Sequence, residues 1–204
     1  MNDANRTATG PDADNGPSPG TGRETPRPRP STLPVGVTVI DTARLLLRPL
    51  RAEDLDDLAD YRARPDVFRY QGHEPWDREQ LARVLDGEVR HARLPYTVTG
   101  RILWGVLLKE TGRLIGEVML AGADGAHEIG VVFHPDHQRR GLAFEAVNAV
   151  LTRACAELGV ARVQAYSHPD NTRAIRLLGL LGLHRSGTAD GFDTFERTTL
   201  PAQV

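Results

Sequence analysis

Apolar and polar residues follow two different periods along the chain after residue 41. They alternate over 42–50, and the apolar runs 101–108 and 114–120 are joined by a turn containing Gly112, which is typical of a β-hairpin. Apolar residues at helical spacing predict four helices, and the remaining apolar runs predict four more strands. The helices are expected at about 52–63, 77–92, 143–158 and 171–181, and the strands at 127–134, 161–168, 185–187 and 192–200.

Local signals at the ends of these elements support the helices. Asp77 and Gln80 have the spacing of a capping box, and Asn171 is a good N-cap for the last helix. Gly159 is placed to end the helix before it. The order of elements predicts one α/β domain with about seven strands and four helices over residues 35–204.

Residues 1–34 differ in composition from the rest of the chain. Seven of the 14 prolines fall there, among Gly, Ser, Thr and Asp, and no large apolar residue occurs between Met1 and Leu33. Such a segment buries too little apolar surface to offset the entropy cost of ordering it. We expect a disordered N-terminal tail over 1–34.

The composition also bounds the class of protein. With 204 residues, of which 40% are hydrophobic, the chain can form one core. The formal net charge is −2, so electrostatics gives no reason to expect a nucleic-acid partner. The only cysteine, Cys155, forms no internal disulfide, and no apolar run has the length of a membrane span or the form of a signal peptide. We expect a cytoplasmic protein without a membrane partner.

The segment 138–143, of sequence QRRGLA, follows a predicted strand and opens a predicted helix. A helix start has backbone N–H groups without partners and a partial positive charge, and a loop tightened by Gly141 can bring those groups against a phosphate. Arg139 and Arg140 add full positive charges. The segment fits neither of the common glycine-rich nucleotide motifs, G-x-x-x-x-G-K-[ST] and G-x-G-x-x-G.

The same segment resembles the acyl-CoA pyrophosphate loop of the GNAT N-acetyltransferase superfamily. Its pattern, [RQ]-x-x-G-x-[GA], is met at Gln138, Gly141 and Ala143. The surrounding order of strand, loop, helix, strand and Pro169-Asp170-Asn171, with a later L-G-L, is most similar to the RimJ/RimL branch. The resemblance covers about residues 41–200.

The resemblance implies a mixed, mostly antiparallel sheet in which the parallel strands 127–134 and 161–168 splay apart to admit acetyl-CoA. No metal is implied. The family places the pantetheine arm along the first of these strands, the pyrophosphate on the loop, and an asparagine beside the arm; Asn171 as a pure helix cap is the alternative. The residues expected to hold the cosubstrate are Val131, Val132, Phe133, Gln138, Arg139, Arg140, Gly141, Leu142, Ala143 and Asn171.

A general base is expected among the acidic residues of the central strands. Glu128 lies ten residues before Gln138, on the strand where many family members carry a catalytic carboxylate, and Glu117 on the preceding strand is the rival. The family's common tyrosine in the last helix is replaced by Leu178. Water or another group, such as Tyr166, would then protonate the leaving thiolate.

The function implied is transfer of an acetyl group from acetyl-CoA to a primary amine in a ternary complex. The RimJ/RimL resemblance favours a peptide or protein N-terminus as the acceptor, with a small-molecule amine as the alternative. A catalytically weak domain that only senses acyl-CoA is a third reading, because the tyrosine is missing. The chain is expected to be a monomer or a homodimer.

Overall fold

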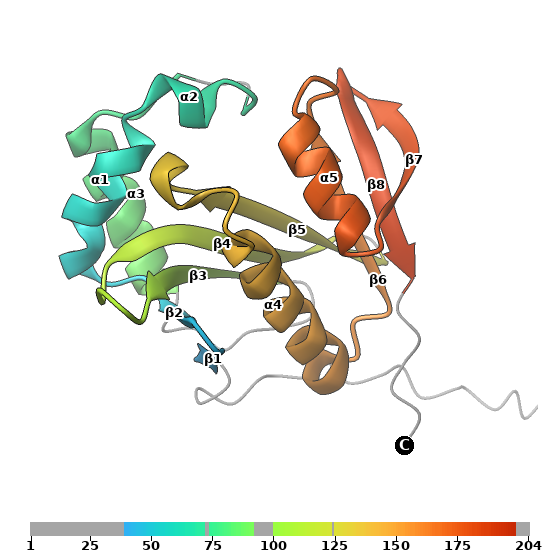
Figure 1. Cartoon of the computed structure of the whole chain (residues 1–204), viewed down its shortest axis with the longest axis horizontal. Coiled ribbons are helices and arrows are strands. Elements are labelled where there is room, and N and C mark those ends of the chain that lie inside the picture. The colour runs from blue at the N-terminus through green and yellow to red at the C-terminus, as the bar shows by residue number, and fades with distance from the viewer. Residues whose placement is uncertain (1–38, 72–73, 92–99, 124, 199–204) are drawn as a thin grey trace, which may run out of the picture.

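A computed structural model of the chain describes residues 39–71, 74–91, 100–123 and 125–198. The expected tail over 1–34 lies outside these ranges. The described residues form one sheet of eight strands in the order β1-β2-β3-β4-β5-β6-β8-β7 (Figure 1). The strands are β1 (Ile40–Asp41), β2 (Leu45–Pro49), β3 (Arg101–Leu108), β4 (Leu114–Ala123), β5 (Ala126–Phe133), β6 (Arg162–Ser167), β7 (His184–Ala189) and β8 (Phe192–Thr198).

All neighbouring strands are antiparallel except β5 and β6, which are parallel. That parallel pair is short. Only His127 with Val163 and Glu128 with Gln164 are in register, although β5 continues to Phe133 and β6 to Ser167. The two strands therefore separate toward their C-terminal ends, as the resemblance implied.

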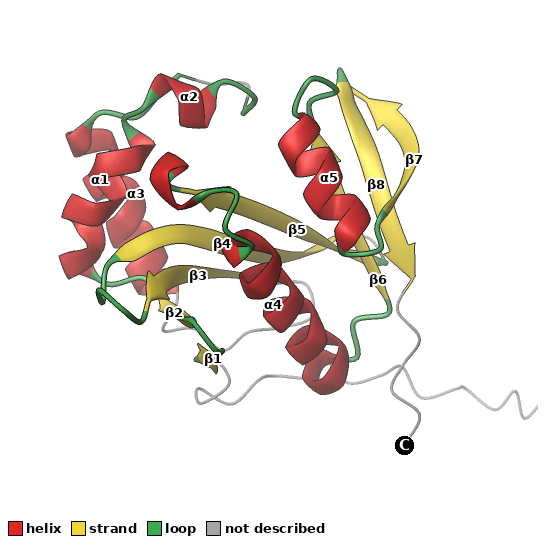
Figure 2. Cartoon of the chain, in the orientation of Figure 1, coloured by secondary structure: helices red, strands yellow, loops and turns green. Residues whose placement is uncertain are grey.

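Five α-helices flank the sheet in the described part of the chain (Figure 2). Helix α4 crosses one face, and α1 and α3 lie together at the end of the sheet formed by β2 to β4 (Figure 1). Helix α5 lies beside β6 and β8. The helices are α1 (Leu55–Arg62), α2 (Pro65–Phe68), α3 (Arg78–His91), α4 (Leu142–Leu158) and α5 (Thr172–Leu180), and two 3-10 turns span Ala52–Asp54 and Pro135–His137.

Two hydrophobic clusters hold these layers together. The larger lies under α4, whose apolar residues recur every three or four positions and are buried against Ile129 and Phe133 of β5. The smaller lies between the sheet and helices α1 and α3, around Leu58, Tyr61 and Leu85. Both faces of β5 are thus covered for part of its length, which fixes its register.

The predicted helix ends are confirmed. The backbone N–H of Gln80 donates to Asp77 Oδ1 at 2.8 Å, and the N–H of Asp77 donates to Gln80 Oε1 at 2.9 Å, which is the capping box. Asn171 Oδ1 accepts the N–H of Ala174 at 3.2 Å. Gly159 ends α4 with φ 64°, in the left-handed region that glycine adopts without strain.

The predicted counts of seven strands and four helices were each one too low. Strand β1 is only two residues long and precedes the predicted first strand, so its pairing with Leu46 and Leu47 gives no sequence period to detect. Helix α2 is a single turn that begins at Pro65 in a segment expected to be loop. Over the described ranges, no helix combines the length and apolarity that crossing a membrane requires.

Candidate active site

The loop after β5 has an unusual backbone. The 3-10 turn Pro135–His137 ends at Gln138, which is extended, and Arg139 then has φ 60°. Gly141 has φ 76° and is the N-cap of α4, whereas φ of Arg140 between them is not positive. Alternation of this kind points successive N–H groups toward one concave side, a geometry that binds anions.

Six consecutive backbone N–H groups are available there. Within the described residues, the N–H groups from Arg139 to Phe144 donate to no protein acceptor, and intrahelical bonding begins with Glu145, whose N–H donates to the carbonyl of Gly141 at 3.0 Å. Arg139 and Arg140 are exposed beside them. Unpaired donors, the positive end of a 17-residue helix and two arginines together fit a diphosphate.

Gln138 braces this loop with its side chain. Its Nε2 donates to the carbonyl of Phe133 at 3.0 Å, and its Oε1 accepts from Arg173 Nη1 at 3.0 Å. One side chain thus ties the end of β5 to α5, across the two halves of the separated sheet. Sequence reasoning placed Gln138 in the site and did not show this bracing contact.

His137 lies beside Arg140 of the loop. Its Nδ1 lies 3.5 Å from Arg140 Nη1, and its ring centroid is 5.4 Å from that of His134. Partial burial lowers the pKa of His137 below its ordinary value of 6.5, and the nearby His134 and Arg140 lower it further. A bound anion would act in the opposite direction, because it favours the charged imidazolium.

The edge of β5 that faces the separation is open. From Ile129 to Phe133 the strand pairs only with β4, so in the described structure Val131, Val132 and Phe133 have no strand partner on the β6 side. Asn171 lies across the separation at the start of α5, where its side chain caps the helix. This is the edge along which the resemblance places the pantetheine arm.

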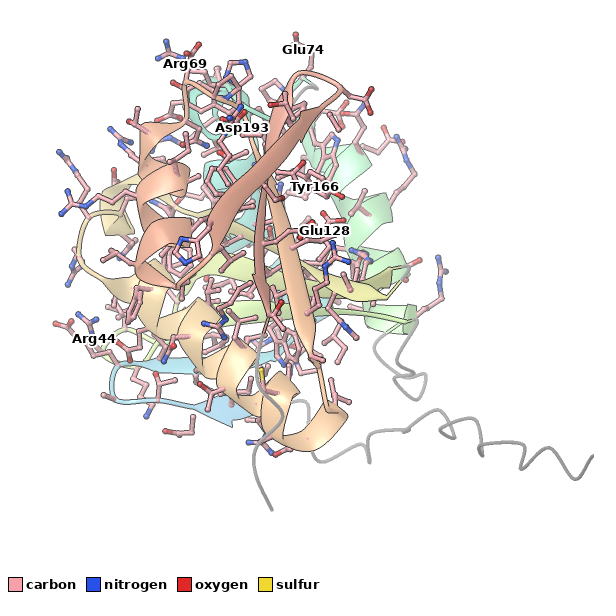
Figure 3. All side chains as sticks on the ribbon, turned by 90° about the vertical axis from the view of Figure 1, so that its right-hand side faces the viewer. Arg44, Arg69, Glu74, Glu128, Tyr166 and Asp193 are labelled. Atoms are coloured by element: carbon pink, nitrogen blue, oxygen red, sulfur yellow. The ribbon has the colours of Figure 1, made fainter. Side chains whose placement is uncertain are left out.

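Glu128 stands where β5 and β6 begin to diverge. It is half-buried, and within the described ranges its carboxylate makes no hydrogen bond or ion pair. It is paired with Gln164, so Gln164 and, two residues later, Tyr166 share its face of the sheet. Figure 3 shows Glu128 and the exposed Tyr166 on the side of the strands away from α4 and α5.

Glu117 lies on the same face but in a different environment. Only 4% of it is exposed, and its Oε2 accepts from Arg62 Nε at 2.8 Å and also from Nη2. Glu117 is paired with Val132 of β5, which lies four residues after Glu128. The two acids are therefore about 13 Å apart along the strand direction. They therefore belong to separate sites, one paired with a cation and one free.

At the open end of the separation, aromatic rings connect the two halves of the molecule. The ring of Tyr70, which follows α2, lies 5.4 Å from that of His168 after β6, and His168 lies 6.1 Å from Phe192 of β8. On the β5 side, His134 is buried, with Nδ1 accepting the N–H of Asp136 at 3.1 Å. The two strand-end histidines thus flank the opening.

Helix α5 presents no tyrosine to the opening. Leu178 is buried in the larger cluster, where a phenol would have to displace core side chains. Among the described residues, no group of three or more His, Cys, Asp or Glu gathers as metal ligands would.

One neighbour of the loop was missed by sequence reasoning. Arg44, in the turn between β1 and β2, donates from Nε to Glu145 Oε2 at 2.7 Å and from Nη1 to the carbonyl of Arg140 at 3.0 Å. About a hundred residues separate it from both partners, so no local pattern signals the contact. Burial alone would raise the pKa of Glu145, but hydrogen bonds from Thr42 and Arg44 lower it overall.

Comparison with known proteins identifies the family of this chain. The acetyltransferase (GNAT) domain family matches residues 44–184, most of the described chain. The chain belongs to the GNAT acetyltransferase family. It is 30% identical over 149 residues to the uncharacterized N-acetyltransferase p20 of Bacillus licheniformis, covering 72% of this chain and 82% of that protein. The GNAT chain described here is thus an N-acetyltransferase.

Solved structures show the same fold at lower identity. A GNAT-family acetyltransferase from Bacillus anthracis superposes with a TM-score of 0.67 at 22% identity, over 81% of this chain and 99% of that one. RimL, a ribosomal L7/L12 alpha-N-protein acetyltransferase in complex with coenzyme A, superposes with a TM-score of 0.66 at 13% identity, over 78% of this chain and 97% of RimL. The prediction of a GNAT fold with a mixed, mostly antiparallel sheet is confirmed.

Proposed function

We propose that this GNAT protein transfers the acetyl group of acetyl-CoA to a primary amine, and that the preferred acceptor is the N-terminus of a peptide or protein. The observation that carries the proposal is that the free N–H groups of the loop lie close to the unpaired edge of β5. Six N–H groups without protein acceptors begin six residues after the end of β5, whose edge toward β6 is unpaired from Ile129 onward. The first suits a diphosphate and the second an extended amide-containing arm, which are the two polar parts of coenzyme A.

The residues that would hold acetyl-CoA follow from this geometry. The N–H groups from Arg139 to Ala143 would donate to the diphosphate, while Gln138 keeps the loop against β5 and α5. The backbone of Val131, Val132 and Phe133 would pair with the pantetheine amides, and Asn171 would face the arm from α5. When bound, acetyl-CoA supplies an activated thioester carbonyl.

We assign the general base to Glu128. An acceptor amine must lose a proton before or during attack, and a base needs a free lone pair within reach. The Glu128 carboxylate has no partner among the described residues, whereas the Glu117 carboxylate is paired with Arg62. Transfer is then direct: Glu128 removes a proton, either directly or through a water, and among the described residues no activated nucleophile stands beside it.

The acceptor class rests on the fold neighbours and on the surface around Glu128. RimL, a ribosomal L7/L12 alpha-N-protein acetyltransferase, shares the fold of this chain. Glu128, Gln164 and Tyr166 lie on a sheet face that α4 and α5 leave uncovered, which suits a bulky acceptor approaching from solvent. A small-molecule amine is the competing acceptor.

The test is turnover by the purified full-length chain with acetyl-CoA. The acceptors are a peptide library with free N-termini, the same library with blocked N-termini and internal lysines, and a panel of small polyamines. Thiol release and mass spectrometry should show α-amine acetylation of the free-terminus peptides only. Acetylation of polyamines alone would show that the acceptor is a small-molecule amine. Absence of thiol release with every amine would refute the proposal.

A further inference from the structure

Arg44 contacts the proposed phosphate loop, residues 138–143, although it lies about a hundred residues earlier in the chain. It lies in the turn between β1 and β2, and its backbone N–H donates to Glu145 Oε1 at 2.9 Å while its Nε donates to Oε2 at 2.7 Å. Its Nη1 donates to the carbonyl of Arg140 at 3.0 Å. The guanidinium is thus fixed both to the first turn of α4 and to the loop backbone.

The third nitrogen of this guanidinium is uncommitted. In the described part of the chain, Arg44 Nη2 has no acceptor, and it lies 3.5 Å from the point that a Cβ on Gly141 would occupy. Gly141 carries one of the six free N–H groups. A planar fork held through two nitrogens, with the third directed at the loop, loses little conformational entropy when it accepts an anion.

The ion pair with Glu145 has a second consequence. Glu145 places a carboxylate in the first turn of α4, where it would repel a phosphate bound at the helix start. Arg44 compensates that charge directly, and the Thr42 hydroxyl also donates to Glu145 Oε1 at 2.7 Å. Arg139 and Arg140 have no carboxylate partner within the described residues, so their charges remain for the ligand.

We propose that Arg44 is a further phosphate-binding residue of this site, with its Nη2 donating to the diphosphate of acyl-CoA. The inference rests on the proposed use of the loop for acyl-CoA. It assigns part of the binding site to the turn before β2, outside the loop motif. In that arrangement Glu145 orients the arginine, and Arg44 and the loop amides contact the ligand together.

Calorimetry with CoA and with 3′-dephospho-CoA tests the assignment in the full-length chain. Arg44→Gln should weaken the binding of both ligands by about tenfold or more, because a charge-assisted hydrogen bond is lost. Arg44→Lys should be intermediate, since it keeps the charge but not the fork. The matched control is Arg83→Gln, which removes an exposed arginine on α3 and should bind CoA as the unmodified chain does.

The double variant Arg44→Gln/Glu145→Gln distinguishes direct contact of Arg44 with the ligand from neutralisation of the Glu145 charge. If Nη2 contacts the ligand, affinity stays low in the double variant; recovery would show that Arg44 only neutralises Glu145, and would overturn the proposal. A loss for CoA but not for dephospho-CoA would place Arg44 at the 3′-phosphate instead. Unchanged binding in Arg44→Gln, together with loss in Gly141→Val, would refute the role of Arg44 and leave the proposed function intact. No CoA binding by the unmodified chain would refute both.

Discussion

Arg62 at the end of α1 and Glu117 in the middle of β4 form a buried ion pair. Arg62 Nε lies 2.8 Å from Glu117 Oε2, and 9% and 4% of the two residues are exposed. The same guanidinium lies 5.7 Å from the ring centroid of Phe68 and 5.3 Å from that of Trp76. Arg62 therefore fixes α2 and the start of α3 to the central sheet, on the face that also carries Glu128.

Breaking this pair should be strongly destabilising. Glu117→Gln or Arg62→Met leaves one charge buried without its partner, which typically costs about 3–5 kcal/mol in the free energy of unfolding. Urea denaturation followed by circular dichroism measures the loss. Arg83→Gln, which breaks an exposed pair on α3, is the control and should change stability by about 0.5 kcal/mol or less. Equal, small losses in all three would mean that the Arg62–Glu117 pair is not buried in solution.

Replacing Tyr61, which lies next to this ion pair, should stabilise the fold. It is fully buried, and its hydroxyl has no hydrogen-bond partner in the described structure. Burial, with the nearby charge of Glu117 adding to it, raises the pKa of Tyr61 well above its ordinary value of 10. Tyr61→Phe removes an unsatisfied polar atom and should stabilise the fold by about 1 kcal/mol. A loss of stability in the same urea titration would show that the hydroxyl has a partner.

Most of the fold could be predicted from sequence because its elements carry local signals. The period of α4, the capping box at Asp77 and the hairpin turn at Gly112 each depend on residues a few positions apart. The family's pyrophosphate-loop pattern could be matched for the same reason, since Gln138, Gly141 and Ala143 are close in sequence, and its role in binding phosphate stays a proposal. Among the described strands and α-helices, the two shortest, β1 and α2, were missed.

The contacts that shape the site could not be predicted in this way. Arg44 and Glu145 are 101 residues apart, and Arg62 and Glu117 are 55 apart. One sequence gives the charges but not the pairing, so Glu117 and Glu128 remained rivals. The structure distinguishes the two, because the Glu117 carboxylate is paired with Arg62 and the Glu128 carboxylate is paired with no cation among the described residues.

The backbone of the phosphate loop gives a sharp prediction for Gly141. Its φ of 76° is unfavourable for a β-branched residue, so Gly141→Val should distort the loop and remove measurable CoA binding. Arg140→Ala should reduce affinity only modestly, because the N–H groups stay in place. Calorimetry with CoA compares the two variants. Equal effects would show that the amides of the loop do not form the binding site.

Proton uptake should accompany ligand binding through His137. Its lowered pKa leaves the imidazole largely neutral in the free protein at neutral pH, and a bound diphosphate should raise that pKa again. Affinity should therefore increase as the pH falls from about 7.5 toward 6. Calorimetry with 3′-dephospho-CoA, in buffers of different ionisation enthalpy, measures the uptake without titration of the 3′-phosphate. His137→Gln should abolish it, and uptake that persists in this variant would assign the proton to another group.

The most direct test of the account is the pH profile of acetyl transfer by Glu128→Gln. Glutamine keeps the shape of the side chain but cannot accept a proton, so kcat should fall by about a hundredfold or more while CoA affinity is retained. The acidic limb of the kcat/KM profile should also disappear. Glu196→Gln, on the same sheet face and paired with Arg162, is the control and should leave the profile unchanged. Near-normal turnover by Glu128→Gln, with its acidic limb intact, would contradict the assignment of Glu128 as the base.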